Sequence, residues 1–273
     1  MKKILIIISI CFLSNISFGQ KVVVPTPTRM LAKNKINIDE IKNMTYSITI
    51  GYGDEVDAAV KFAFEKYWKL SPLKYVVPDP KAYYGNQTNF YLVGYEEKKY
   101  QWTAARFRLP NISYEPDFDD YRKGKKLFGV DSTSHMIAVK VIPFIMCYAA
   151  EVKRASEMGS DKYWFFEGLK DKVKNYKVLI QKESVGNKRI SELPFKTYLK
   201  SYECLPANDI DKKIRSQENT EKTALLIIGQ DWNEMHVSII DIKTGDLLYR
   251  SSIRSSEFND KTMTNLLKGL ENQ

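Results

Sequence analysis

The sequence predicts an α/β or α+β protein made of two halves, each with its own mixed sheet. Short β-branched or continuous apolar runs, typical of strands, alternate with longer segments whose apolar residues recur at helical spacing. Similar pieces occur in the same order on both sides of a charged segment with two prolines at 109–129. Hydrophobic residues make up 44% of the 273 residues, which is enough for a large core and excludes a disordered chain.

The first nineteen residues are typical of a cleaved secretory signal. Lys2 and Lys3 precede an apolar run at Ile4–Leu13, and small residues lead up to a cleavage point after Gly19. The run is too short for a membrane-spanning helix, which needs about 20 apolar residues. We therefore expect a mature chain that begins at Gln20, with no transmembrane span after cleavage.

Export changes both the charge and the cysteine count. The net charge of +9 falls to +7 when the two lysines of the signal are lost. Cys11 would be a lipoprotein cysteine only if a small residue preceded it, and Ile10 does not fit that pattern. Cys147 and Cys204 then remain in a compartment that permits disulfides, either as a disulfide or as two buried thiols; their spacing does not decide between these.

The first half is expected at 44–128, after an extended lead-in at 20–43 that is rich in proline near its start. Its predicted elements are a strand at 46–50, a helix at 54–69, and strands at 73–77, 90–95 and 100–108. Gly51 and Gly53 precede the helix, but the acidic Asp54 and Glu55 at its start repel a phosphate, and Asp54 is expected to cap it. This loop is therefore not a nucleotide site.

The second half is expected at 129–273, after a loop or boundary at 109–129. Its predicted elements are a strand at 136–142, a helix at 161–175, a strand at 177–181, a helix from Ser191 through Tyr202, a helical turn at 209–215, a strand at 224–228, a hairpin of 235–242 with 247–251, and a helix around 263–270. Gly245 supplies the positive φ that the hairpin turn needs.

The order of these pieces suggests an internal duplication. The helix and strand at 54–79 parallel those at 161–182, and the strand at 90–96 parallels that at 225–231. Any mixed α/β chain can offer such coincidences, so duplication and coincidence are both open.

The hairpin at 224–252, with Thr244-Gly245-Asp246 at its turn, resembles one in periplasmic domains of the curli secretion channel family and of the N-terminal domain of TolB-like proteins. The segment 161–181 and the final helix lie in compatible order. The resemblance implies an α/β sandwich used for assembly or docking at the outer membrane, with no catalytic residues to carry over. The lipid-bearing cysteine and long membrane hairpins of those families are missing, so no pore is inferred.

The inventory of reactive residues disfavours catalysis and metal binding. His135 and His236 are the only histidines, and His236 is expected on a hairpin surface. Cysteine and histidine are too scattered for structural zinc. The acidic cluster of Glu115, Asp117, Asp119 and Asp120 lacks the calcium-loop pattern and is interpreted as a solvated loop. We therefore expect no metal and no cofactor, and favour a non-enzymatic protein over an enzyme.

Two groups of residues are weak binding candidates. The basic residues could contact anionic lipid or acidic glycans in the cell envelope, or form a solvated loop. The aromatic residues could stack on sugars or anchor a protein interface, or lie half-buried in a sheet. The basic group is Arg122, Lys123, Lys125 and Lys126, and the aromatic group is Tyr83, Tyr84 and Trp102.

These features predict an exported protein of the periplasm or the periphery of the outer membrane, with an extracellular location left open. Its expected role is that of a non-enzymatic binding or assembly component of the bacterial cell envelope, with an envelope protein as partner. A hydrolase of envelope polymers and a glycan-binding protein are the alternatives. Nucleic acid is not an expected partner, because exported proteins rarely meet it and lysine and glutamate are mixed along most helices.

Overall fold

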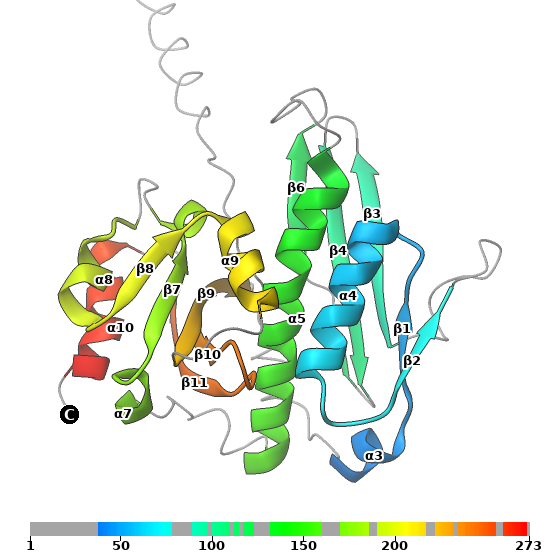
Figure 1. Ribbon diagram of the computed structural model, residues 1–273, viewed down its shortest axis with the longest axis horizontal. Coiled ribbons are helices and arrows are strands. Elements are labelled where there is room, and N and C mark those ends of the chain that lie inside the picture. The colour runs from blue at the N-terminus through cyan, green and yellow to red at the C-terminus, as the bar shows by residue number, and fades with distance from the viewer. Residues whose placement is uncertain are drawn as a thin grey trace, which may run out of the picture.

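The protein consists of two sheets that alternate with two layers of helices (Figure 1). The computed structural model describes residues 38–77, 89–97, 100–109, 112–114, 117–122, 132–159, 170–185, 190–216, 222–231, 234–254 and 259–271. The predicted fold class, helices with two mixed sheets, is confirmed. None of the helices in these ranges is both long enough and apolar enough to cross a membrane.

The first sheet is built from residues 46–122. Its strands are β1 (Tyr46–Thr49), β2 (Leu73–Val76), β3 (Phe90–Glu97), β4 (Tyr100–Leu109), β5 (Ile112–Tyr114) and β6 (Asp117–Arg122). They follow the order β2-β1-β3-β4-β5, and β6 also pairs with β4. Strand β1 is parallel to β2 and β3, whereas β4 is antiparallel to its neighbours. Helix α3 (Ile38–Asn43) precedes this sheet, and α4 (Asp54–Tyr67) connects β1 to β2.

The second sheet is built from residues 177–254. Its strands are β7 (Lys177–Gln181), β8 (Tyr202–Leu205), β9 (Thr223–Asp231), β10 (Glu234–Asp241) and β11 (Leu247–Arg254), in the order β11-β10-β9-β7-β8. The helices of this half are α7 (Lys170–Val173), the 3₁₀ turn η1 (Lys182–Ser184), α8 (Leu193–Tyr198), α9 (Ala207–Arg215) and α10 (Asp260–Glu271).

Strands β1 to β5 of the first sheet have the same order and directions as the five strands of the second, whereas β6 has no counterpart there. In each, the first strand (β1 or β7) is parallel to the next two, and the third (β3 or β9) begins an antiparallel run. Strands β3 and β9 occupy the same position in the two sheets, and they are the strands that were paired in the sequence comparison of 90–96 with 225–231. Helix α4 lies between β1 and β2, so its counterpart is α8, which lies between β7 and β8. The counterpart expected from the sequence, the segment 161–175, precedes β7 instead. Shared topology supports an internal duplication.

The long helix α5 (Ser132–Met158) replaces the strand predicted at 136–142, so that prediction was wrong. Every residue from 141 to 150 is buried. Helix α5 packs beside α4 and also contacts α9, β10 and β11. The enclosed segment 141–150 is apolar on every side of the helix and contains Pro143, so the sequence there shows neither helical periodicity nor an uninterrupted helix.

Two cores hold the layers together. In the first, aromatic rings from the first sheet, α4 and α5 pack in contact; they are Tyr46, Phe64, Trp68, Phe90, Phe107, Phe144 and Tyr148. The second sheet is buried on both faces. On β7, Leu179 belongs to the first core, whereas Val178 and Ile180 belong to the second core, which includes residues of α8 and α10.

Three further sequence predictions need correction. The loop expected at 109–129 contains β5 and β6, so Asp117, Asp119 and Asp120 are strand residues. The lead-in expected to be extended through 43 ends in helix α3. Tyr202 begins strand β8 and does not belong to the helix after Ser191.

Candidate functional site

A cavity of about 310 Å³ lies at one edge of the second sheet, where β7 and β8 begin. Its lining comes from three places: the segment from α7 into β7, the end of α8 with the turn that follows, and the last turn of α10. The lining residues are Val173, Lys174, Tyr176, Val178, Thr197, Tyr198, Leu199, Lys200, Ser201 and Leu270. Because β7 and β8 are parallel, the segments that precede them meet at the same edge, and Val178 N donates to Ser201 O at 3.0 Å.

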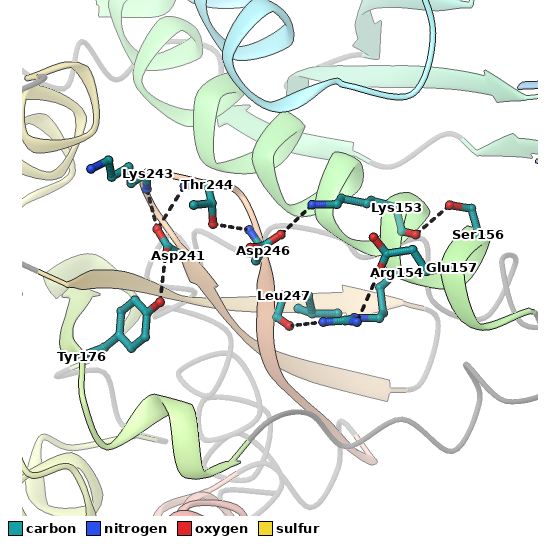
Figure 2. Close-up of polar contacts among 10 residues, drawn as sticks. All are labelled: Lys153, Arg154, Ser156, Glu157, Tyr176, Asp241, Lys243, Thr244, Asp246 and Leu247. Carbon is teal, nitrogen blue, oxygen red and sulfur yellow. Dashed lines mark hydrogen bonds and ion pairs between the residues drawn. The ribbon is translucent and has the colours of Figure 1, made fainter. Parts of the chain in front are cut away.

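Tyr176 is held in the cavity wall by a hydrogen bond to the β10–β11 turn. Its hydroxyl donates to Asp241 Oδ2 at 2.8 Å, as Figure 2 shows. Asp241 Oδ1 accepts the backbone N–H groups of Lys243 and Thr244 at 2.7 and 3.1 Å. Burial, together with the Asp241 carboxylate, raises the pKa of Tyr176 to about 12, so the hydroxyl keeps its proton at neutral pH and remains the donor.

The same turn is attached to α5. Lys153 Nζ lies 2.6 Å from Asp246 Oδ1, and Arg154 Nη2 donates to Leu247 O at 3.5 Å (Figure 2). Burial alone would raise the pKa of Asp246, but its contacts with Lys153 and Thr244 bring that pKa below its ordinary value. The Lys153–Asp246 pair is partly exposed and contributes at most about 1 kcal/mol, so its main effect is to orient the turn.

The lining combines apolar surface, hydroxyl groups and positive charge. Aliphatic and tyrosine residues make most of it, and Lys174 and Lys200 also belong to it. Among the described residues, the lining has no carboxyl, imidazole or thiol group, but it includes hydroxyl and lysine side chains, which act as nucleophiles or bases in some enzymes. This arrangement can bind a ligand through its apolar and polar groups.

A second cluster of polar residues is buried between α5 and the second sheet. Ser238 Oγ donates to Glu151 Oε1 at 3.4 Å, and Cys147 Sγ lies 3.8 Å from the same oxygen. Arg250 is the cross-strand neighbour of Ser238, and His236 lies on the same face of β10. Glu151, His236 and Ser238 are fully buried. Since these residues are buried, the cluster has a structural role in holding α5 against the second sheet.

His236 was expected on the surface, and that expectation was wrong. It is fully buried because β10 is covered on both faces, which a hairpin pattern in the sequence does not reveal. Burial, with the positive charge of Arg250, lowers the pKa of His236 to about 3. The ring is therefore neutral at neutral pH.

Cys147 and Cys204 are free thiols, so the disulfide considered above is not formed. Cys147 belongs to the first core, and Cys204 on β8 packs against the second core. Burial raises the pKa of Cys204 to about 11, with Glu192 adding to the effect. Burial likewise raises the pKa of Cys147, which keeps both thiols protonated.

The Gly51–Gly53 loop is occupied by the chain's own carboxylate. Asp57 accepts the N–H of Gly51 at 2.9 Å and that of Tyr52 at 3.0 Å. Asp54, expected to cap the helix, is its first residue, and Gly53 is the N-cap residue with φ 104°. The loop amides therefore already carry an anionic partner.

Most of the sequence-predicted binding residues lie outside the described residues: Lys123, Lys125, Lys126, Tyr83 and Tyr84. Arg122 ends β6, and Trp102 lies in β4 opposite Tyr95 and Asp120, with only their backbone described. His135 lies in the first turn of α5. Within the described ranges, no three His, Cys, Asp or Glu residues are grouped so as to hold a metal ion.

The cavity was not predicted from the sequence. The residues that line it come from separate segments, and none of these segments has a distinctive pattern by itself. One signal was available: a lysine and a tyrosine two residues apart precede each strand, Lys174 and Tyr176 before β7 and Tyr198 and Lys200 before β8. Recognising two parallel neighbouring strands there would have placed both pairs at one sheet edge. Comparison with known proteins found no matching family model, no matching curated protein and no matching solved structure.

Proposed function

We propose that the protein is an exported, non-enzymatic binding component of the bacterial cell envelope, and that it binds its ligand in the cavity beside β7 and α8. The observation that carries this proposal is the lining, in which the described residues are aliphatic, tyrosine, hydroxyl and lysine residues without a carboxyl, imidazole or thiol group. Such a surface can recognise a ligand by shape and charge without changing it.

The exposed apolar side chains among the described residues favour a small ligand over a protein docking face. Val77 and Leu193, at 71% and 65% exposure, are the large apolar side chains exposed in the described part of the chain. They belong to different halves, at the end of β2 and the start of α8. Single exposed apolar residues do not form the patch of several hundred Å² that marks a protein interface.

The envelope location rests on the predicted signal at 1–19 and on the resemblance of the β10–β11 hairpin to periplasmic assembly domains. An envelope hydrolase is less well supported, because His236, one of the groups that such a site would use, is closed off from solvent. A glycan-binding role through Tyr83, Tyr84 and Trp102 has no described side chain to support it.

The test uses the mature chain from Gln20 and a small-molecule extract of the envelope of the source cells. Protein incubated with extract is desalted, and the bound compounds are identified by mass spectrometry. Ser201→Trp would fill the cavity mouth, whereas Ser216→Trp places the same side chain at the exposed end of α9, away from the cavity. We expect the wild type and Ser216→Trp to retain the same compound and Ser201→Trp to lose it.

The fate of the compound separates binding from catalysis. A binding component returns it chemically unchanged after prolonged incubation. Conversion to a product by the wild type would support the hydrolase instead. Equal retention by wild type and Ser201→Trp would mean that the cavity is not the binding site.

A further inference from the structure

We propose that the cavity takes a planar aromatic ring, such as the indole or phenyl ring of a small compound. This inference rests on the proposed function and adds the chemical class of the ligand. It comes from a comparison of the two halves, because the place in the first half that corresponds to the cavity is filled by the side chain of Trp68.

The C-terminal ends of α4 and α8 correspond residue by residue. Each helix ends at a C-cap residue with extended backbone, Trp68 after α4 and Leu199 after α8. The N–H of each C-cap residue donates at 2.9 Å to the carbonyl oxygen of a fully buried phenylalanine, Phe64 in α4 and Phe195 in α8. Trp68 and Leu199 therefore occupy the same position in the two halves.

The adjacent strands correspond in the same way. In the first sheet, Tyr46 N donates to Pro72 O at 2.8 Å. In the second sheet, Val178 N donates to Ser201 O at 3.0 Å. Pro72 and Ser201 are the residues immediately before β2 and β8. Tyr46 and Val178 are therefore counterparts, and each belongs to the core that its sheet forms with its own helices.

In the first half, this place is filled by aromatic rings. The ring centroid of Trp68 lies 4.3 Å from that of Tyr46 and 6.1 Å from that of Tyr148 on α5, with which it is stacked. The indole Nε1 donates at 2.9 Å to Ser71 Oγ, in the turn before β2. Only 3% of Trp68 is exposed. The fold thus encloses an indole ring between β1 and α5, with one hydroxyl as its polar partner.

In the second half, the same place is bordered by aliphatic side chains. Leu199 stands in the position of Trp68 and Val178 in that of Tyr46, and both line the cavity. Leu270 lines it from α10, which packs beside α8 as α5 packs beside α4. Because leucine and valine have no ring, the space that an indole occupies in the first half is left as a cavity.

The lining offers an aromatic ligand contacts like those of Trp68. Its aliphatic residues provide apolar surface, and a ring beside Tyr176 or Tyr198 gains more than burial alone provides. Ser201 lines the cavity from the turn before β8, as Ser71 lies in the turn before β2. A hydroxyl there can accept a hydrogen bond from a ring N–H. A planar ring therefore matches this lining better than a saturated body of the same size.

The experiment follows the binding of three probes to the ¹⁵N-labelled mature chain by two-dimensional NMR. Indole is the first probe. Benzyl alcohol and cyclohexylmethanol form a matched pair, since both are neutral and share one carbon skeleton, but only benzyl alcohol is aromatic. Leu199→Trp gives the second half the residue that fills this place in the first half. Lys196→Trp is the matched control, because Lys196 is exposed on α8 and does not line the cavity.

We expect indole and benzyl alcohol to shift amides at residues 173–178, 197–201 and 270. Benzyl alcohol should bind about two- to tenfold more tightly than cyclohexylmethanol. Leu199→Trp should weaken all three probes about tenfold or more, because its own indole takes the space, whereas Lys196→Trp should leave the affinities within about twofold. The fluorescence that Leu199→Trp adds should have the short-wavelength emission of a buried indole. Emission typical of an exposed indole would overturn the correspondence with Trp68.

The outcomes separate the ligand class from the proposed function. If cyclohexylmethanol binds as tightly as benzyl alcohol, and Leu199→Trp blocks both, the aromatic class is wrong while the cavity remains the binding site. If no aromatic probe binds while the envelope compound does and is lost in Ser201→Trp, the aromatic class is overturned and the proposed function stands. If neither the probes nor any envelope compound depends on Leu199 or Ser201, both proposals fail.

Circular dichroism of each variant confirms that it is folded, so that lost binding is not mistaken for lost structure. If Leu199→Trp does not fold, Ser201→Trp takes its place in the titrations, with the same expected loss of binding.

Discussion

Gly245 lies against the ring of Tyr67, so close that a Cβ atom on Gly245 would come within 2.8 Å of Tyr67 Cδ1. The Tyr67 hydroxyl also donates to Ile242 O at 2.8 Å. Tyr67 ends α4 in the first half, whereas Ile242 and Gly245 belong to the β10–β11 turn of the second half. This turn therefore joins the halves, and the same turn holds Tyr176 through Asp241.

Substitution of Gly245 by alanine should destabilise the fold by about 2–4 kcal/mol, because φ of 73° costs about 1–2 kcal/mol for an L residue and the added methyl displaces the Tyr67 ring. Gly159→Ala is the matched control. Its φ is 81°, but the new Cβ would meet no atom within 4 Å. Urea unfolding of both variants measures the difference, and equal losses would show that the contact with Tyr67 is not tight.

The link between Asp241 and Tyr176 can be broken without disrupting the turn. Asp241→Asn retains an oxygen for the N–H groups of Lys243 and Thr244, but its amide nitrogen cannot accept the Tyr176 hydroxyl. We expect a loss of about 1 kcal/mol in stability. We also expect weaker binding of any ligand in the cavity, since its wall is less well held. Asp241→Ala should cost more stability, because it also removes the acceptor in the turn.

Calorimetry and urea unfolding of the two variants provide the check. Unchanged ligand affinity in Asp241→Asn would mean that Tyr176 needs no support from the turn.

Burial of His236 predicts that stability falls in mild acid. The pKa is about 3 in the folded protein against 6.5 for an ordinary histidine, so between these values the unfolded chain binds the extra proton and stability rises with pH. The slope is about 1.4 kcal/mol per pH unit, or about 2 kcal/mol between pH 6.5 and 5. The charged groups near the ring do not change the expected direction of this pH dependence. Arg250 is positive and lowers the pKa of His236, and the carboxylate of Glu151 accepts a hydrogen bond from Ser238, which lies on the same face of β10.

Urea unfolding at pH 7, 6 and 5 tests this, with His236→Gln as the comparison. The variant is expected to be less stable at pH 7 but to have a flatter dependence on pH. The same slope in both proteins would assign the effect to other groups.

The two thiols are expected to react differently. Cys147 is fully buried, whereas Cys204 is partly exposed on the edge strand β8. With its pKa near 11, Cys204 should be alkylated slowly in the native protein, and Cys147 only after unfolding. Peptide mapping after alkylation measures both sites. A peptide pair joined through the two cysteines would contradict the structure.

Local patterns predicted much of the fold. Strand β1, helix α4, the β10–β11 hairpin and helix α10 were recognisable because each combines a run or periodic pattern of apolar residues with a turn or cap signal. Helix α5 was missed because burial between two layers removes its periodicity. Strand β8 was missed because its four residues are all partly buried and show no alternation.

The candidate site was less predictable than the fold. Its residues flank separate strands, and only the parallel pairing of β7 with β8 brings Lys174 and Lys200 to the same cavity. The burial of His236 and the separation of the two cysteines likewise depend on which layers face each other. Such relationships are set by tertiary packing, which single-residue patterns do not encode.

The central claim is that ligand binds at the edge of the second sheet, and amide chemical shifts test it most directly. The mature chain, labelled with ¹⁵N, is titrated with the compound that the wild type retains from the envelope extract and followed by two-dimensional NMR. The account predicts saturable shifts that concentrate at residues 173–178, 197–201 and 270, and that disappear in Ser201→Trp. Saturable shifts elsewhere on the protein, unchanged by Ser201→Trp, would contradict it.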